Sequence, residues 1–271
     1  LVLIRADGTA MYPVGDIALA EQKIQDFDPE HSLYVVDIRQ SLYFQQLFKL
    51  LKLAGHEQRF VHLGFDFVKL PEGMMSSRTG NIITYKDLKE KMLDQSRKET
   101  KERHPDWSEE ETEEVARTIA LGAMKFEMLK VEASNTITFD IDKALRFEGY
   151  TAAYIQYTYA RINSIIEKAG SPPDMNDIDP SRLHEDKEKQ LIIKMSKYPE
   201  IVRRAGTGYD PSELAKYLFD LTRTFNDYYH SISIIQNEKE TQKARLSLIV
   251  GIQHIIKNGL GLLGIDVITK M

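Results

Sequence analysis

The hydrophobic pattern of this 271-residue chain changes character once along its length. In the first ninety residues, short apolar runs typical of strands alternate with segments of helical spacing, whereas from Asp140 onward the spacing is helical almost to the end. Strand–helix alternation is typical of a sheet with parallel strands, and continuous helical spacing is typical of a helix bundle. We therefore expect an α/β domain over residues 1–145, followed by an all-α domain over residues 146–271.

The first part contains four short apolar runs of strand type, at residues 1–4, at 33–36, within 61–70 and at 82–85. Helical spacing occupies residues 16–24 and 40–54, and Gly55 stands where the second helix is expected to end. The run at residues 1–4 has the pattern of a strand entered midway. We therefore expect a longer protein, whose preceding segment completes the sheet.

Capping residues indicate where several of the expected helices begin. Ser108 and Glu111 form a capping-box pattern at the start of a helix that runs through Lys125. Asp210 followed by Pro211 is typical of the start of another. The remaining expected elements are helices at residues 86–103, 141–168 and 239–262 and an extended segment at 136–139.

The charge balance and the absence of cysteine exclude several classes of protein. Lys and Arg total 36 against 41 Asp and Glu, and the net charge of −5 excludes a generic polycation that coats nucleic acid. Without cysteine the chain can form no disulfide, thiolate nucleophile, zinc–thiolate site or iron–sulfur cluster, and this suits a cytoplasmic location. We expect no metal site, no DNA partner and no membrane partner.

One polar loop carries the strongest chemical signal. Residues 73–81, with the sequence GMMSSRTGN, place two hydroxyls, one guanidinium and two glycines between strand-like segments. Backbone N–H groups, serine hydroxyls and an arginine fork can all bind phosphate oxygens. Taken alone, however, the loop fits a plain polar surface turn better than a phosphate site.

Five blocks of sequence, taken in order, resemble arginyl-tRNA synthetases. They are residues 7–20, residues 34–48, the loop MSSRTG at 75–80, the segment TAAYIQYTYAR at 151–161, and the last part of the chain from Ala244 to Met271. The loop is similar to a degenerate form of the class I K-M-S-K-S signature, and residues 151–161 are similar to the helix that opens the family's anticodon-binding domain. The H-I-G-H signature of class I is absent, and we expect it in an N-terminal half outside this sequence.

The resemblance implies the C-terminal half of a Rossmann-type class I catalytic domain, followed by a helical-bundle anticodon-binding domain. It implies an arginine–tRNA ligase that activates L-arginine with ATP, carried with Mg²⁺, and transfers it to tRNA-Arg. The chain alone, without the H-I-G-H half, is expected to be inactive. Two alternatives stay open: a stand-alone tRNA-binding module that has lost the chemistry, and a helical scaffold attached to an unrelated nucleotide-binding enzyme.

For the amino-acid site, the resemblance implies Tyr12, Asp16 and Gln40. An aspartate can accept a bidentate fork from a guanidinium, which separates arginine from lysine. Tyr12 lies one helical turn before Asp16, and Gln40 follows a strand end, so both can reach the same ligand. Without the resemblance, Asp16 is explained equally well as an acid that complements a helix dipole. For Tyr12 and Gln40 alone, packing or surface placement is the stronger interpretation.

The resemblance also implies nucleotide and RNA contacts. The residues expected to be catalytic are Ser76, Ser77 and Arg78, and those expected to bind ATP are Met75, Ser76, Ser77, Arg78, Gly80 and Asn81. The residues expected to bind tRNA are Tyr154, Tyr157, Arg161, Tyr229 and Met271. The first three share one helix face and pair stacking rings with a phosphate-binding fork. Stripes of rings and arginine are more often core plus rim, and a terminal Met271 is open to simple fraying.

Overall fold

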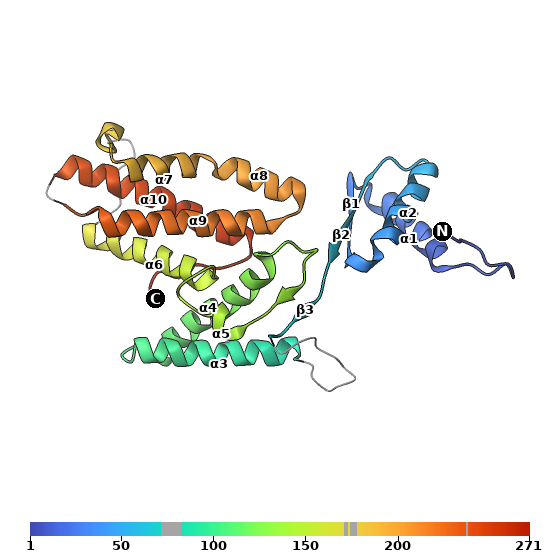
Figure 1. The fold of residues 1–271 in the computed structure, drawn as a ribbon, viewed down its shortest axis with the longest axis horizontal. Helices are drawn as coiled ribbons and strands as arrows, with labels where there is room; N and C mark the ends of the chain where they lie inside the picture. The colour runs from blue at the N-terminus through green and yellow to red at the C-terminus, as the bar shows by residue number, and fades with distance from the viewer. Residues whose placement is uncertain (72–82, 171–172, 174–177, 237) are drawn as a thin grey trace. The chain divides into compact units, whose positions relative to one another are not determined.

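The computed structural model describes residues 1–71, 83–170, 173, 178–236 and 238–271. They form two compact units, drawn in Figure 1 with the chain coloured from blue to red. The first unit comprises Leu1–Phe67 with Ala133–Thr136, and the second comprises Val68–Glu132 with Ile137–Met271. Within the described residues, no helix is both long and apolar enough to cross a membrane.

The first unit is built around a parallel strand–helix–strand motif. Its elements are α1 (Tyr12–Phe27), β1 (His31–Asp37), the short 3-10 helix η1 (Ile38–Gln40), α2 (Ser41–Leu53) and β2 (Arg59–Phe65). The two strands pair in parallel along their whole length, with α2 as the connection between them. This arrangement confirms the parallel strands that the alternating pattern predicts.

Two glycines shape this motif. Gly55 follows α2 with φ of +93°, in the left-handed region that ends helices, as predicted. Gly64 lies in β2, where a Cβ would stand 2.5 Å from the Cδ1 atom of Ile38. Because Gly64 has no side chain, η1 can pack directly against β2.

The core of this unit lies between its helices. Apolar residues of α2 at spacings of three and four, Phe44, Leu47 and Leu51, are buried with Ala20 of α1.

The second unit begins with paired helices and short strands. It contains β3 (Val68–Lys69), α3 (Tyr85–Arg103), α4 (Glu109–Leu129), β4 (Ile137–Thr138) and α5 (Ile141–Ala144), and β3 pairs with β4 in parallel. The predicted capping box opens α4: the Ser108 hydroxyl accepts from the Glu111 amide at 3.2 Å, and Glu111 Oε2 accepts from the Ser108 amide at 3.0 Å. A second capping box joins Thr84 and Asp87 at the start of α3.

The remaining helices form a bundle, which confirms the predicted helical second part. They are α6 (Ala152–Ala169), η2 (Pro180–Arg182), α7 (Asp186–Ser196), α8 (Tyr198–Gly208), α9 (Pro211–Ser231) and α10 (Lys239–Leu262). Figure 1 shows α7 and α8 following one another along α9. The bundle core is formed by apolar side chains such as Leu218, Phe225 and Ile252, all fully buried.

Three sequence predictions of local structure are wrong. Residues 1–4 form no strand, since the chain turns at Gly8 (φ +85°) and Ile4 makes only an isolated antiparallel bridge with Ala10. The predicted helix at 141–168 is broken by Gly149, which has φ of +79°, so α5 and α6 are separate. In the predicted strand 82–85, Ile82 lies outside the described residues and Tyr85 already begins α3.

Candidate functional site

Asp16 connects the two helices of the first unit. It lies in α1, half-buried, and its Oδ2 atom accepts a hydrogen bond from the Tyr43 hydroxyl of α2. Burial, together with the hydrogen bond to Asp16, raises the pKa of the Tyr43 phenol, so the phenol keeps its proton and acts as the donor. The second carboxylate oxygen of Asp16, Oδ1, has no hydrogen-bond partner among the described residues.

The other two predicted arginine-site residues belong to the same pair of helices. Tyr12 is the first residue of α1, one turn before Asp16, and its side chain is 87% exposed. Gln40 is the last residue of η1, directly after the carboxyl end of β1, and is also exposed. It precedes Tyr43 by three residues, which is about one helical turn. The structure therefore brings Tyr12, Asp16 and Gln40 onto adjoining segments of one unit.

A clamp between Asp37 and Arg39 fixes the turn that carries Gln40. Asp37 Oδ1 accepts from the backbone amide and from Nε of Arg39, both at 2.8 Å, and Asp37 Oδ2 accepts from Nη2 at 2.6 Å. These bonds lower the pKa of Asp37 to about 2. The guanidinium also lies over the Phe67 ring at 4.6 Å. This clamp was not predicted from the sequence, although an Asp two residues before an Arg was the available signal.

The predicted phosphate-binding residues fall outside the part of the chain that the structure describes. They are Met75, Ser76, Ser77, Arg78, Gly80 and Asn81. The flanking chain is described up to residue 71 and again from residue 83, where the Thr84 cap leads into α3.

In the second unit, Arg161 lies at the centre of a polar and aromatic cluster between α6 and α9. Its Nη1 donates a hydrogen bond to the Asn226 side-chain oxygen. Its guanidinium lies 4.7 Å from the ring centre of Tyr157 and 5.2 Å from that of Tyr229. Arg161 is half-buried and Tyr229 is 37% exposed, so the cluster reaches the surface. Three of the predicted tRNA-binding residues are therefore brought together.

Asn226 joins the same cluster to α6 through hydrogen bonds. It is 6% exposed, and its Nδ2 donates to the Tyr154 hydroxyl at 2.9 Å and to the Thr158 hydroxyl at 3.0 Å. The Tyr154 ring also packs on Phe219, with 5.6 Å between the ring centres. Asn226 and Thr158 were not predicted from the sequence. The available signal was a polar residue next to the apolar stripe of α9.

The chain end is held against the bundle. Gln156, fully buried on α6, donates to the Asp266 carbonyl at 2.8 Å, and Lys125 donates to the Gly264 carbonyl. Met271 packs, half-buried, against a second apolar cluster that includes Met92. The terminus is therefore not simply frayed, and Met271 packs on this second cluster.

Two family matches define the class of protein. Residues 1–141 match the family described as tRNA synthetases class I (R), catalytic domain, and residues 155–271 match the DALR anticodon binding domain. A parallel strand–helix–strand unit followed by a helical bundle agrees with both, so the fold is that of a class I aminoacyl-tRNA synthetase. The chain belongs to the arginyl family of these synthetases, as the sequence blocks predict, and the catalytic match does not favour a stand-alone tRNA-binding module.

Individual proteins similar in sequence to this chain belong to the same family. The arginine–tRNA ligase of Bdellovibrio bacteriovorus is 37% identical over 274 residues, which cover all of this chain and 47% of that protein. The corresponding ligase of Halobacterium salinarum is 35% identical over 270 residues, covering 99% of this chain and 42% of its own length. The chain thus spans about half the length of the curated relatives it matches.

Solved structures give the same result. The arginyl-tRNA synthetase of Thermus thermophilus superposes with a TM-score of 0.87 at 30% identity, covering all of this chain and 51% of that structure. The enzyme of Plasmodium falciparum superposes with a TM-score of 0.84 at 25% identity, over 99% of this chain and 46% of that structure. The predicted fold class, an α/β catalytic part followed by a helical anticodon-binding domain, is confirmed.

Proposed function

We propose that this chain is part of an arginine–tRNA ligase, which joins L-arginine to tRNA-Arg at the expense of ATP in cytoplasmic protein synthesis. The single observation that carries the proposal is the carboxylate of Asp16, held on one oxygen by Tyr43 and open on the other. The family match over residues 1–141 supports it.

We also propose a domain boundary near residue 145, which the two family matches support because one ends at 141 and the next begins at 155.

The proposed arginine site uses Asp16 as its anionic centre. The guanidinium of arginine is planar and always charged, and it donates in a fork that a carboxylate can accept, whereas the ammonium of lysine is a compact point charge. Because Tyr43 fixes the orientation of the carboxylate, Oδ1 is presented in one direction. Tyr12 and Gln40 then contribute an aromatic ring and a side-chain amide to the same ligand.

The proposed nucleotide site is the loop at residues 75–81. Met75, Ser76, Ser77, Arg78, Gly80 and Asn81 would hold the triphosphate of ATP, with Ser76, Ser77 and Arg78 stabilising the pyrophosphate as it leaves. Mg²⁺ arrives bound to ATP, as part of the substrate. Catalysis in this scheme consists of positioning and charge stabilisation, and no side chain has to act as a nucleophile.

The proposed tRNA site is the cluster around Arg161. Tyr157 and Tyr229 flank the guanidinium and offer ring faces for stacking bases, while Arg161 offers donors for a phosphate. Tyr154 contributes by holding Asn226, which in turn orients Arg161. Met271 would add an apolar contact at the chain end. The match of residues 155–271 to an anticodon-binding family supports this assignment.

The test is the substitution Asp16→Asn in the complete gene product. A neutral amide cannot present two anionic oxygens, and loss of a charge-assisted hydrogen bond costs about 1.5–3 kcal/mol, or about 10- to 150-fold in binding. We expect the KM for arginine in tRNA aminoacylation to rise by about that factor while the KM for ATP stays nearly constant. Asp26→Asn, an exposed acid on the same helix, is the matched control. An unchanged KM for arginine with normal turnover would leave Asp16 as a helix acid only.

A further inference from the structure

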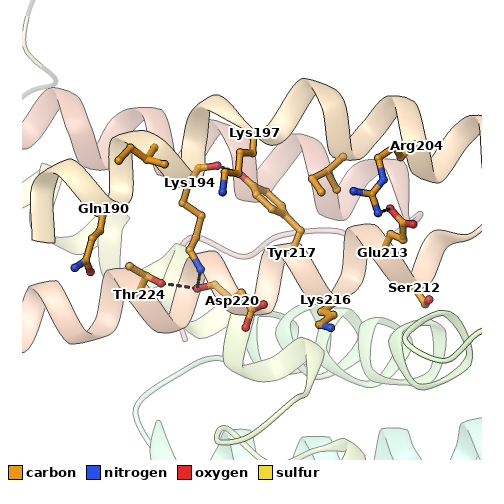
Figure 2. Close-up of a pocket in the computed structure, with 12 residues that line it drawn as sticks. Gln190, Lys194, Lys197, Arg204, Ser212, Glu213, Lys216, Tyr217, Asp220 and Thr224 are labelled. Atoms are coloured by element: carbon orange, nitrogen blue, oxygen red, sulfur yellow. Dashed lines mark hydrogen bonds and ion pairs between the residues drawn. The ribbon is translucent and has the colours of Figure 1, made fainter.

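A groove that the proposed function does not use lies between α7, α8 and α9. Figure 2 shows it as an open trough with side chains from all three helices along its walls. Its volume is about 730 Å³. Its lining on α9 runs from Ser212 to Thr224, and at 1.5 Å per residue this is about 18 Å, or roughly three helical turns.

The groove is on a different side of α9 from the cluster around Arg161. Glu213, Tyr217, Asp220 and Thr224 recur at spacings of four and three, so they share one face of the helix. Asn226, the α9 residue that binds Arg161, is rotated by at least about 120° from these four residues at 100° per residue. The other two lining residues of α9, Ser212 and Lys216, are nearer to Asn226 in rotation but lie 14 and 10 residues away, or about 21 and 15 Å along the helix. A ligand of the groove therefore need not compete with tRNA bound at Arg161.

The groove has an excess of positive charge in a chain whose net charge is −5. Four cations line it against two acids. Arg204 is paired with Glu213 at 2.8 Å, and Lys194 donates to the Asp220 carbonyl at 3.3 Å. The remaining two cations are Lys197 and Lys216, both exposed, and neither ammonium group has a hydrogen bond or ion pair within the described residues. These two ammonium groups favour an anionic ligand.

Apolar side chains line the same groove. Ile193 of α7 is 57% exposed, and Ile201 of α8, which lines the same groove, is half-buried. Tyr217 lies at the floor of the groove and is only 8% exposed, and its hydroxyl already donates to the Lys194 carbonyl at 3.0 Å, so the floor has no free polar group on this residue. A free phosphate or nucleic-acid backbone would leave this apolar surface uncovered, and it would also meet Glu213 and Asp220. The ligand that fits must itself carry apolar side chains.

We propose that this groove binds an acidic amphipathic helix of a partner protein. Such a helix lays its apolar face on Ile193 and Ile201, above the buried Tyr217, and its flanking carboxylates pair with Lys197 and Lys216. Three turns of helix match the length of the groove. Because it depends only on the bundle, the proposal holds whether or not the proposed arginine site is correct.

The test uses two synthetic helical peptides that share one Leu/Ile face, one with flanking glutamates and the other with flanking lysines. Fluorescence anisotropy measures the binding of each labelled peptide to the 271-residue chain. The glutamate peptide is expected to bind at least tenfold more tightly than the lysine peptide. In the double variant Lys197→Glu/Lys216→Glu this preference should reverse, and a reversal cannot arise from misfolding. The matched control, Lys168→Glu/Lys257→Glu on α6 and α10, should leave the preference unchanged.

A third variant tests the apolar part, and a competition experiment tests the alternative ligand. Ile193→Gln, at an exposed position that tolerates a polar side chain, should weaken the glutamate peptide by about fivefold or more. Excess tRNA should not displace the peptide, because the two sites lie on different faces of α9. Equal affinity for both peptides, a preference that survives the charge reversal, or displacement by tRNA would each overturn the proposal; displacement would assign the groove to RNA.

Discussion

Asp16 illustrates how one carboxylate can serve structure and ligand at once. Tyr43 occupies Oδ2, and the geometry leaves Oδ1 for a donor from outside the chain. A carboxylate whose orientation is already fixed loses less conformational entropy when it binds a guanidinium than one that rotates freely. Tyr43 is therefore a positioning residue in the proposed site, and its contribution is separable from that of Asp16.

Replacing Tyr43 by Phe tests this role. The ring remains to pack against Phe44, but the hydrogen bond to Asp16 is lost, a change of about 1 kcal/mol. We expect the KM for arginine to rise by about fivefold with kcat nearly unchanged, measured in tRNA aminoacylation by the complete gene product. Tyr85→Phe, at an exposed tyrosine of α3, serves as the control. A fall in kcat with an unaltered KM for arginine would contradict the positioning role.

The shared helix faces of the candidate site could be predicted from the sequence because their signals are local. The four-residue step from Tyr12 to Asp16 fixes their common helix face, and the spacing of Tyr157 and Arg161 does the same on α6. Tyr43 and Asn226 could not be predicted in this way. They lie 27 and 65 residues from Asp16 and Arg161 in sequence, and only the packing of two helices brings each pair together.

At the scale of helices and strands, elements fixed by local hydrogen bonds were predicted correctly, whereas an element that depends on a distant partner was not. The starts of α4 and α9 were predicted because Ser108 and Asp210 cap their own helices through local hydrogen bonds. The apolar run at residues 1–4 has no such local determinant. Whether it becomes a strand depends on a neighbouring strand, and within the described residues it finds only the bridge from Ile4 to Ala10.

The packing of α7 against α10 depends on a buried ion pair. Arg245 Nε donates to Glu188 Oε1 at 2.8 Å, and Arg245 Nη1 donates to the Ser233 carbonyl at 2.9 Å. Glu188 is fully buried, and its other oxygen accepts from the Glu185 amide at 3.0 Å. Arg245→Met should therefore leave an uncompensated buried carboxylate and lower the free energy of unfolding of the bundle by about 3–5 kcal/mol.

Urea unfolding followed by helix circular dichroism measures this loss. The double variant Glu188→Leu/Arg245→Met removes both charges and should recover much of the stability, because no charge remains buried alone. Arg223→Met, at an exposed arginine paired with Asp220 at 3.6 Å, should change stability by less than about 1 kcal/mol. A double variant less stable than either single one would contradict this account of the pair.

The substitution Arg161→Ala tests whether the cluster between α6 and α9 binds tRNA. If Arg161 binds a phosphate, its removal should weaken tRNA binding and reduce the slope of log affinity against log salt by about one. Filter binding of tRNA to the 271-residue chain at several salt concentrations gives both quantities. Lys257→Ala on α10 is the control. A melting curve shows whether loss of the hydrogen bond to Asn226 lowers the stability of the bundle. An unchanged salt slope would place Arg161 in a purely structural role.

At the scale of the whole molecule, the two units divide the proposed function. The first unit contains the residues proposed to select arginine, and the second contains those proposed to bind tRNA. Each unit has its own apolar core, so substitutions in one are expected to leave the other folded. Amino-acid selection and RNA binding should therefore be separable by mutation.

The most direct test of the central proposal is a comparison of amino acids in tRNA aminoacylation. The complete gene product is supplied with ATP, Mg²⁺, tRNA and one labelled amino acid at a time, and the label attached to tRNA is counted. We predict that arginine is attached and that lysine, which has the same charge but no planar fork, is not. A product that binds tRNA but attaches no amino acid, or attaches lysine as readily as arginine, would contradict the proposal.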